Sequence, residues 1–356
     1  MTADPGRRRL LGRAWPWIKY AGGIGLAALA LWAVTGRRGE LSGASHYLSH
    51  LRWPLLILAA AAELGSFVAF AVVQQRFLQA GGVTMSVGRL TAVTLASTAM
   101  ANSMPAGPLL SLVYSFRQYR RRGADRALAG WTLSAVFVCA SVTLAVLAAA
   151  GLAVAGAEGT GLDLIGVTVG VLVAALAMGL LFVQRRAVVW MMTGVLRVCR
   201  RWLQWPSVGL ETRIESVMGR LTSVTLSGPE LAAVTGWGLS NWVLDCGCLA
   251  LSFLAVGVGV PWKGLLLAYG AGQLAANLPI TPGGLGVVEG SLTIALVAFG
   301  GLEASTIAAV LLYRILSFWT ELPLGWGLWA ALAWSDRRAD ARDEASAVPE
   351  PVEVGS

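Results

Sequence analysis

The chain has 356 residues, of which 56% are hydrophobic and 13% are charged. Soluble domains carry about 25% charged residues, so the composition excludes a soluble protein and predicts an all-α polytopic membrane protein. The net charge of +8 gathers in short loops and at the N-terminus, as in the cytoplasmic segments of membrane proteins, and does not indicate a nucleic-acid partner.

Apolar runs of about 20 residues predict about six full transmembrane helices. Residues 1–16 form a basic N-terminus that is expected in the cytoplasm. The first run resembles a signal peptide, but no small-x-small cleavage site precedes the next span, so we interpret it as a helix. The expected helices are residues 17–35, 53–73, 128–155, 161–183, 231–257 and 305–333.

The segments between and after these helices divide into three kinds. Residues 88–112 and 264–300 are apolar but interrupted, and we expect each to form a re-entrant hairpin. Residues 187–226 mix Arg, Trp and apolar residues, which indicates either an amphipathic connector on the inner leaflet or a plain cytoplasmic connector. Residues 336–356 are polar and predict a disordered cytoplasmic tail after a transmembrane domain of residues 17–335.

Both interrupted segments contain an Asn followed by Pro and Gly. The first copy runs from Asn102 to Pro108, and the second runs from Asn277 to Gly284. Pro removes a backbone donor and Gly permits tight turns, so both copies break a helix. Such breaks are tolerated at membrane depth only inside protein or beside a water-filled cavity, and a matched pair indicates a transporter's binding site.

Each interrupted segment lies between two full helices, which gives two similar units, about 53–155 and 231–333. The tripeptide that begins at Glu63 in the first unit matches the tripeptide that begins at Asp245 in the second. Three predicted spans separate the two hairpins, so the first should open to the cytoplasm and the second to the outside. We therefore expect an inverted repeat, which is typical of alternating-access carriers.

Five ionisable residues lie inside predicted spans or hairpins: Glu63, Asp245, Glu289, Arg314 and Glu321. Each costs about 2.5–3.5 kcal/mol on insertion scales and is a functional candidate for that reason. The alternative is a structural ion pair, for which Arg314 and Glu321 lie two helical turns apart on one face. Glu289 begins the second limb of its hairpin, where free amides would favour a phosphate or Glu289 itself.

A basic run after the first hairpin is the natural phosphate contact at the inner leaflet. Each basic residue near an anionic leaflet contributes about 1 kcal/mol to binding. The alternative is that the run only fixes topology. Its residues are Arg117, Arg120, Arg121 and Arg122.

Signatures of catalysis and of metal binding are missing from the sequence. It contains no Walker loop, no His-Glu-x-x-His and no Gly-x-Ser-x-Gly, so we expect no catalytic residue and no cofactor. His46 and His50 have no carboxylate beside them, so no metal site is expected. The four cysteines follow no spaced framework, and we interpret them as small buried residues.

The segment from Ala276 to Glu289, followed by Tyr313-Arg314, resembles the signature of the lysylphosphatidylglycerol synthase transmembrane (flippase-like) family. The run from Asn102 to Gly107 resembles the earlier Asn-x-x-Pro-x-Gly element of that family. The resemblance covers about residues 50–335. By position it implies these site residues: Asn102, Pro105, Gly107, Asn277, Pro279, Pro282, Gly283, Gly284, Glu289 and Arg314.

The resemblance implies a bacterial inner-membrane protein similar to the flippase half of the multiple peptide resistance factor. That half moves an aminoacylated phosphatidylglycerol between leaflets, and a soluble aminoacyl-transferase domain follows it. Only residues 336–356 follow the last predicted helix here, so lipid aminoacylation is not expected and the chain is not expected to be an enzyme. The chain departs from symmetry near Ser134, where no charged pair matches Arg314.

The leading hypothesis from the sequence is a lipid translocase in the plasma membrane, with both termini in the cytoplasm. Its expected partners are membrane lipids, either anionic phospholipids or polyprenyl-phosphate lipids. One alternative is a membrane scaffold or subunit for a separate lipid-modifying enzyme. The other is an ion-coupled carrier of small solutes, which an inverted repeat would equally allow.

Overall fold

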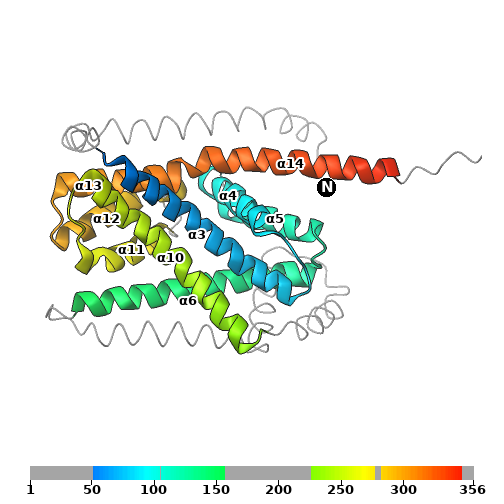
Figure 1. The fold of residues 1–356 in the computed structure, drawn as a ribbon, viewed down its shortest axis with the longest axis horizontal. Helices are drawn as coiled ribbons and strands as arrows, with labels where there is room; N and C mark the ends of the chain where they lie inside the picture. The colour runs from blue at the N-terminus through cyan, green and yellow to red at the C-terminus, as the bar shows by residue number, and fades with distance from the viewer. Residues whose placement is uncertain (1–50, 105, 157–225, 277–281, 347–356) are drawn as a thin grey trace, which may run out of the picture.

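The computed structural model describes residues 51–104, 106–156, 226–276 and 282–346, and these ranges contain helices and no strand. Figure 1 shows the helices as one bundle. They are α3 (Trp53–Ala80), α4 (Val87–Ser103), α5 (Gly107–Arg121), α6 (Arg126–Gly156), α10 (Gly228–Val256), α11 (Trp262–Ala276), the 3-10 turn η1 (Pro282–Gly284), α12 (Val287–Ala298), α13 (Glu303–Arg314), the π-helix η2 (Ile315–Trp319) and α14 (Glu321–Ser346).

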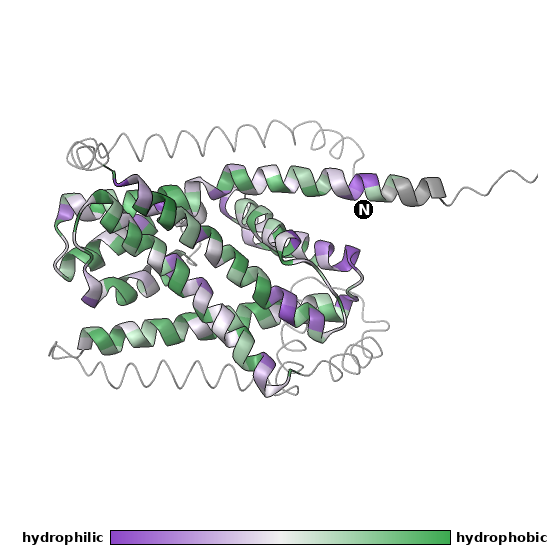
Figure 2. Ribbon diagram, viewed as in Figure 1, coloured by the Kyte–Doolittle hydropathy of each residue, from purple (hydrophilic) through white to green (hydrophobic). Residues whose placement is uncertain are grey.

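Four helices are long and apolar enough to cross a membrane: Trp53–Ala80, Arg126–Gly156, Gly228–Val256 and Glu303–Ala339. They confirm the second, third, fifth and sixth helices predicted from the sequence, and they make this a multi-pass membrane protein. Figure 2 shows apolar residues along these helices and polar residues toward their ends. The N-terminus 1–16, the predicted helices 17–35 and 161–183 and the connector up to residue 225 lie outside the described residues.

Helices α3 and α10 form the centre of the bundle and run antiparallel. The backbone nitrogen of Arg52, which precedes α3, donates to the carbonyl oxygen of Ala255 near the end of α10 at 2.9 Å. At the opposite end of the pair, Val234 packs with Val73 and Phe77. The first helix of one unit therefore lies against the first helix of the other in the reverse direction.

The helix pairing of the first unit recurs in the second. Helix α4 packs against α5 and α14, and α11 packs against α12 and α6 in the corresponding way. Figure 1 shows α6 along one edge of the bundle and α14 along the other, running in opposite directions. This arrangement is the one that a two-fold axis between inverted units would produce, and the inverted repeat itself stays a prediction.

Two glycines allow the closest of these helix contacts. A Cβ on Gly151 of α6 would lie 2.7 Å from the backbone nitrogen of Leu267 in α11. A Cβ on Gly325 of α14 would lie 2.3 Å from the carbonyl oxygen of Leu95 in α4. Small residues let helix backbones approach this closely in membranes. The two contacts occupy matching places in the repeated pairing.

A buried polar network joins α3, α4 and α5. The Tyr119 hydroxyl donates to Gln74 Oε1 at 2.6 Å, and Gln74 Nε2 donates to Thr94 Oγ1 at 2.8 Å. All three side chains are buried. Hydrogen bonds in such low-dielectric surroundings are strong, so the network holds the first hairpin against the central helix.

Helix α14 continues to Ser346, whereas the sequence predicted a disordered tail from residue 336. The segment after Trp334 is rich in Ala, Arg, Asp and Glu, and several of these are strong helix formers. Asp336 is also anchored to three arginines of α4 and α5, as described below. The polar composition was therefore compatible with a helix that extends past the apolar span.

Candidate functional site

The first break lies between α4 and α5. Helix α4 ends at Ser103, and Ala106 adopts the left-handed conformation with φ 55° before Gly107 begins α5. A Cβ on Gly107 would lie 2.2 Å from the carbonyl oxygen of Ala101, so only glycine fits this position. Asn102 lies half-buried in the last turn of α4. Pro105 lies outside the described residues.

The second break lies between α11 and α12 and contains the turn η1, which begins at Pro282. Gly283 and Gly284 have φ of 62° and 68°, values that favour glycine. Asn277 and Pro279 lie outside the described residues. Helix α4, which ends at the first break, contacts η1. The two interrupted segments therefore meet inside the bundle.

Glu289 and Arg314 tie the second break to the last long helix. Glu289 Oε2 accepts a hydrogen bond from the backbone nitrogen of Gly286 at 2.7 Å, so the carboxylate itself caps the start of α12. Arg314 Nε donates to Glu289 Oε1 at 2.7 Å, and Arg314 NH2 donates to the carbonyl oxygen of Gly283 at 3.0 Å. The guanidinium also lies 4.5 Å from the ring centroid of Phe318.

The alternative ion pair between Arg314 and Glu321 is wrong, because Arg314 forms its ion pair with Glu289. The reason is the π-helix between the two residues, in which Thr320 N donates to Ile315 O at 2.9 Å. A π-turn holds more residues than an α-turn, so seven positions no longer return to the same helix face. Nothing in the amino-acid sequence indicates this change of helical period.

Glu63, Asp245 and Glu321 bring three carboxyl groups together from α3, α10 and α14. We call these three residues the carboxyl cluster. The Glu63 carboxyl interacts with those of both Asp245 and Glu321. Glu63 is 6% exposed and Glu321 is 5% exposed. Glu63 and Asp245, the first residues of the two similar tripeptides, therefore interact in the structure.

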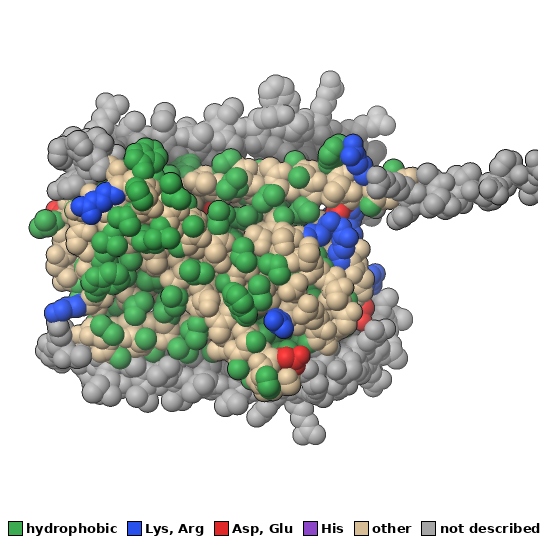
Figure 3. Space-filling view, viewed as in Figure 1, with side chains coloured by type: hydrophobic (Ala, Val, Ile, Leu, Met, Phe, Trp, Pro, Cys, Tyr) green, Lys and Arg blue, Asp and Glu red, His purple; other side chains and the backbone are tan. Residues whose placement is uncertain are grey.

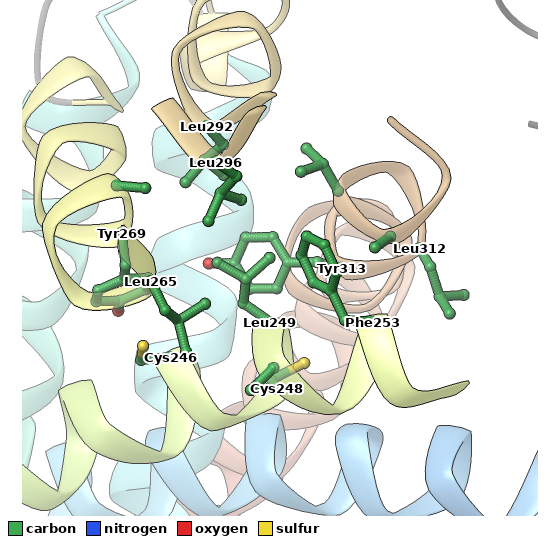
Figure 4. Packing of buried hydrophobic residues seen from close by; sticks show 14 of the residues in the cluster. Cys246, Cys248, Leu249, Phe253, Leu265, Tyr269, Leu292, Leu296, Leu312 and Tyr313 are labelled. Carbon is green, nitrogen blue, oxygen red and sulfur yellow. The ribbon is translucent and has the colours of Figure 1, made fainter. Parts of the chain in front are cut away.

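Asp245 is the best hydrogen-bonded member of the carboxyl cluster. Its Oδ2 accepts from the Tyr269 hydroxyl at 2.7 Å and from Gln273 Nε2 at 3.2 Å, and its Oδ1 accepts from the Tyr313 hydroxyl at 2.8 Å. Figure 4 shows Tyr269 and Tyr313 entering the space above α10 from two other helices. Glu63 Oε2, in contrast, is buried without a hydrogen-bond partner in the described part of the chain.

The positively charged side chain near the carboxyl cluster, Arg314, forms its ion pair with another residue. Arg314 acts on Asp245 and Glu321 electrostatically, but it forms its ion pair with Glu289. Across the described ranges, no Lys, Arg or His forms an ion pair with a member of the cluster. Two like charges 4 Å apart repel by about 4 kcal/mol at an effective dielectric constant of about 20. These ranges also contain no group of His, Cys, Asp and Glu that could hold a metal ion.

A small cavity of about 70 Å³ adjoins the carboxyl cluster between α3, α4, η2 and α14. Its wall is apolar except for Glu63, Thr320 and Glu321. Leu64 is 50% exposed and Leu324 is 45% exposed, so the cavity reaches the apolar outer surface of the bundle. Its lining residues are Ala60, Glu63, Leu64, Phe67, Leu95, Leu316, Thr320, Glu321 and Leu324.

Asp336 of α14 forms ion pairs with three arginines, which we call the Asp336 clasp. Arg89 of α4 pairs with Oδ1, Arg121 NH1 lies 3.2 Å from Oδ2, and Arg122 NH2 lies 3.8 Å from Oδ1. Gln118 Nε2 also donates to Oδ2 at 3.2 Å. Figure 3 shows Lys and Arg side chains gathered at this end of the molecule. The side chain of Asp336 is 7% exposed, so the clasp holds the first hairpin against α14.

The four arginines that were predicted from the sequence as phosphate contacts differ in their contacts in the structure. Arg121 and Arg122 belong to the clasp, while Arg120 NH1 donates to the carbonyl oxygen of Ala124 at 3.0 Å and Arg117 is exposed. Sequence reasoning missed Asp336, because it falls in a polar segment after the last apolar run. An acidic residue within that basic segment was the available signal.

Sequence reasoning also did not select Tyr269 or Gln273, and it treated Tyr313 only as a neighbour of Arg314. Tyr269 and Gln273 are four residues apart on α11, which places both on one face of an otherwise apolar helix. That spacing was the available signal. The interpretation of the cysteines as small buried residues is confirmed for Cys246 and Cys248, whereas Cys139 is only half-buried; all three are free thiols. Cys199 and the two histidines lie outside the described residues.

Comparisons with known proteins agree with this architecture. The family described as Lysylphosphatidylglycerol synthase TM region matches residues 20–325. Two similar proteins are UPF0104 membrane proteins of Methanothermobacter thermautotrophicus, 43% identical over 81 residues and 36% identical over 89 residues. These matches cover 22% and 24% of this chain and 23% and 26% of the relatives, so the chain spans about a quarter of the length of the curated relatives it matches.

Proposed function

The chain belongs to the lysylphosphatidylglycerol synthase transmembrane-region family, and on that premise we propose that it is a lipid translocase. It moves a phospholipid or a polyprenyl-phosphate lipid between the leaflets of the plasma membrane, and it does so without catalysing a reaction on that lipid. Both termini lie in the cytoplasm, and the two interrupted segments are re-entrant hairpins that enter from opposite faces.

The observation that carries this proposal is the apolar cavity between α3, α4, η2 and α14. A soluble solute needs a polar path, whereas this cavity has an apolar wall and reaches the outer surface at Leu64 and Leu324. A lipid acyl chain matches such a wall, and the mouth of the cavity faces the bilayer from which a chain would enter sideways. The polar end of the cavity, at Glu63, Thr320 and Glu321, suits a head group.

The meeting of the two breaks supports a path for the head group. Broken helices at membrane depth expose backbone polar groups that intact helices keep hydrogen-bonded internally. Asn102 and Gly283 lie at these breaks, and Glu289 is fixed beside the second one. Arg117 and Arg120 are exposed at the end of α5 and are positioned to receive phosphate at the inner leaflet.

The test is leaflet exchange in proteoliposomes that contain fluorescent phospholipid or polyprenyl-phosphate analogues. Replacing both Leu64 and Leu324 with Trp fills the mouth of the cavity, and we expect the exchange rate to fall by roughly tenfold or more. The matched control is Ile57→Trp, since Ile57 is 66% exposed on the same helix α3 and does not line the cavity. This control should exchange lipid at the wild-type rate.

Equal exchange in wild type, the double Trp variant and protein-free liposomes, across the whole lipid panel, would contradict the proposal. Stable co-purification of a lipid-modifying enzyme under those conditions would favour the scaffold instead. Gradient-driven uptake of a soluble substrate would favour the solute carrier.

A further inference from the structure

The carboxyl cluster gathers three acidic side chains from three helices without an ion-paired cation in the described part of the chain. More than nine-tenths of Glu63 is buried, and its Oε2 atom has no hydrogen-bond partner in the described ranges. The Glu63 carboxyl interacts with those of both Asp245 and Glu321. Glu63 Oε2 is therefore a buried acceptor beside two other carboxyl groups, which are also acceptors when ionised. A proton bound to one of these carboxyl groups would supply the missing hydrogen-bond donor.

The remaining polar groups around Glu63 do not supply that donor to Oε2. From α10, the Cys248 thiol contacts the Glu63 carboxyl, and from α11 and α13 the Tyr269 and Tyr313 hydroxyls donate to Asp245. Arg314 is held by Glu289. Of the titratable groups on the neighbouring helices α4 and α6, Arg89 pairs with Asp336 and the Cys139 thiol points to the carbonyl oxygen of Val234.

The three carboxyl groups of the cluster lie in different surroundings. Asp245 has both oxygens filled by donated hydrogen bonds, which stabilise its charged form. Glu63 and Glu321 line the cavity, so they are the two members of the carboxyl cluster that face open space. Three adjacent carboxylates cannot all be charged in a low-dielectric interior, so the pair Glu63 and Glu321 is the place for a shared proton.

We propose that Glu63 and Glu321, beside Asp245, form a reversible proton-binding site and that its loading and unloading drive the transport cycle. In the loading step, one proton from water forms an O–H bond on a Glu63 or Glu321 oxygen and neutralises one carboxylate. In the unloading step, that bond breaks, the proton returns to water and the carboxylate reforms. The proton-binding part stands alone, whereas the coupling part rests on the proposed lipid translocation.

The proton site is tested directly by infrared spectroscopy of the full chain in lipid nanodiscs. We expect a carboxylic-acid C=O stretch that persists at neutral pH, where an exposed Glu is ionised. Glu63→Gln and Glu321→Gln should each remove or shift this band. The matched control is Glu303→Gln, since Glu303 is exposed at the start of α13, and it should leave the band unchanged.

The absence of this band in wild type, or its persistence unchanged in both Gln variants, would overturn the proton site. A band that responds to added Na⁺ at fixed pH would also overturn it, because a metal cation would then occupy the cluster. Thermal unfolding of each variant establishes that it is folded, and the two Gln variants provide independent readings if one of them is not.

Coupling is tested by lipid exchange in proteoliposomes with and without an imposed pH gradient. We expect the gradient to change the wild-type rate on the order of tenfold and the Glu63→Gln rate by less than about twofold. Lipid exchange that ignores the gradient would overturn the coupling and leave translocation intact. Absence of any lipid exchange, with the infrared band present, would overturn the proposed function and leave the proton site intact.

Discussion

The guanidinium of Arg314 lies between Glu289 and the carbonyl oxygen of Gly283, with its Nε 2.7 Å from Glu289 Oε1. One side chain at the end of α13 therefore fixes both the glycine turn of the second break and the first turn of α12. A planar guanidinium can make both bonds at once, whereas an ammonium group acts as a single point charge.

Arg314→Lys should therefore destabilise the protein by about 2 kcal/mol, because one of two charge-assisted hydrogen bonds is lost. We also expect lipid exchange to fall by roughly tenfold, since the second break loses its anchor. Thermal unfolding in detergent and the liposome assay measure the two effects. An exposed arginine gives the matched control: Arg337→Lys should change neither, and equal behaviour of the two variants would refute the anchoring role.

Gly325→Leu should destabilise the contact between α14 and α4, because the added side chain would collide with the carbonyl oxygen of Leu95. Overpacking of this kind costs about 1–3 kcal/mol. Gly327→Leu is the control, since a Cβ there meets nothing within 4 Å and the residue is exposed on the same helix. Thermal unfolding of both variants checks the prediction, which fails if they unfold alike.

The same reasoning applies to the matching contact in the other unit. Gly151→Leu should destabilise the packing of α6 on α11 by a similar amount, because the added side chain would meet the backbone at Leu267. If the two units are equivalent, Gly151→Leu and Gly325→Leu should lower the unfolding temperature comparably. A large effect at only one of the two positions would argue against structural equivalence.

Asp336→Asn should release the first hairpin from α14, because three arginines would lose their shared carboxylate. We expect faster amide hydrogen exchange in α5 and at the end of α14, with a loss of about 2 kcal/mol. High salt should narrow the difference from wild type only partly, since the Asp336 side chain is 7% exposed. Unchanged exchange in α5 would mean that the clasp does not hold the hairpin.

Tyr119→Phe should destabilise the protein by about 1–3 kcal/mol, because it leaves the buried Gln74 Oε1 without its donor. A double-mutant cycle with Gln74→Leu measures the interaction, and the effect of Tyr119→Phe should be much smaller in that background. Full additivity of the two changes would show that the hydrogen bond contributes little.

Much of the fold follows from the sequence because a segment that crosses the bilayer must satisfy its backbone hydrogen bonds internally. Long apolar runs must be helices, and the four spans in the described ranges end within about seven residues of their predicted positions. The breaks were also predictable, since Pro105 cannot donate a backbone hydrogen bond within a helix and the positive φ at Gly283 favours glycine. These properties are local in the chain.

The contacts of the site depend on geometry that local rules do not contain. Arg314 turns to Glu289 because a π-helix separates it from Glu321, and the donors to Asp245 come from Tyr269 and Tyr313 on two other helices. Glu63 and Asp245 were matched as residues of two similar units, but their contact follows only from the packing of α3 on α10. The sequence therefore identifies the ionisable residues within the membrane spans, but it does not show which of them contact one another.

The π-helix η2 also sets the rotational phase of everything that follows it in the last span. Deleting one residue there would turn α14 by about 100° and shift it by about 1.5 Å relative to α13. In such a variant Glu321 would no longer lie in the carboxyl cluster. Gly325 would also lose its contact with the backbone of α4, and Asp336 would lose its ion pairs with the arginines. The length of this one π-helix therefore determines both the contacts of α14 in the membrane interior and its contacts at the charged end of the molecule.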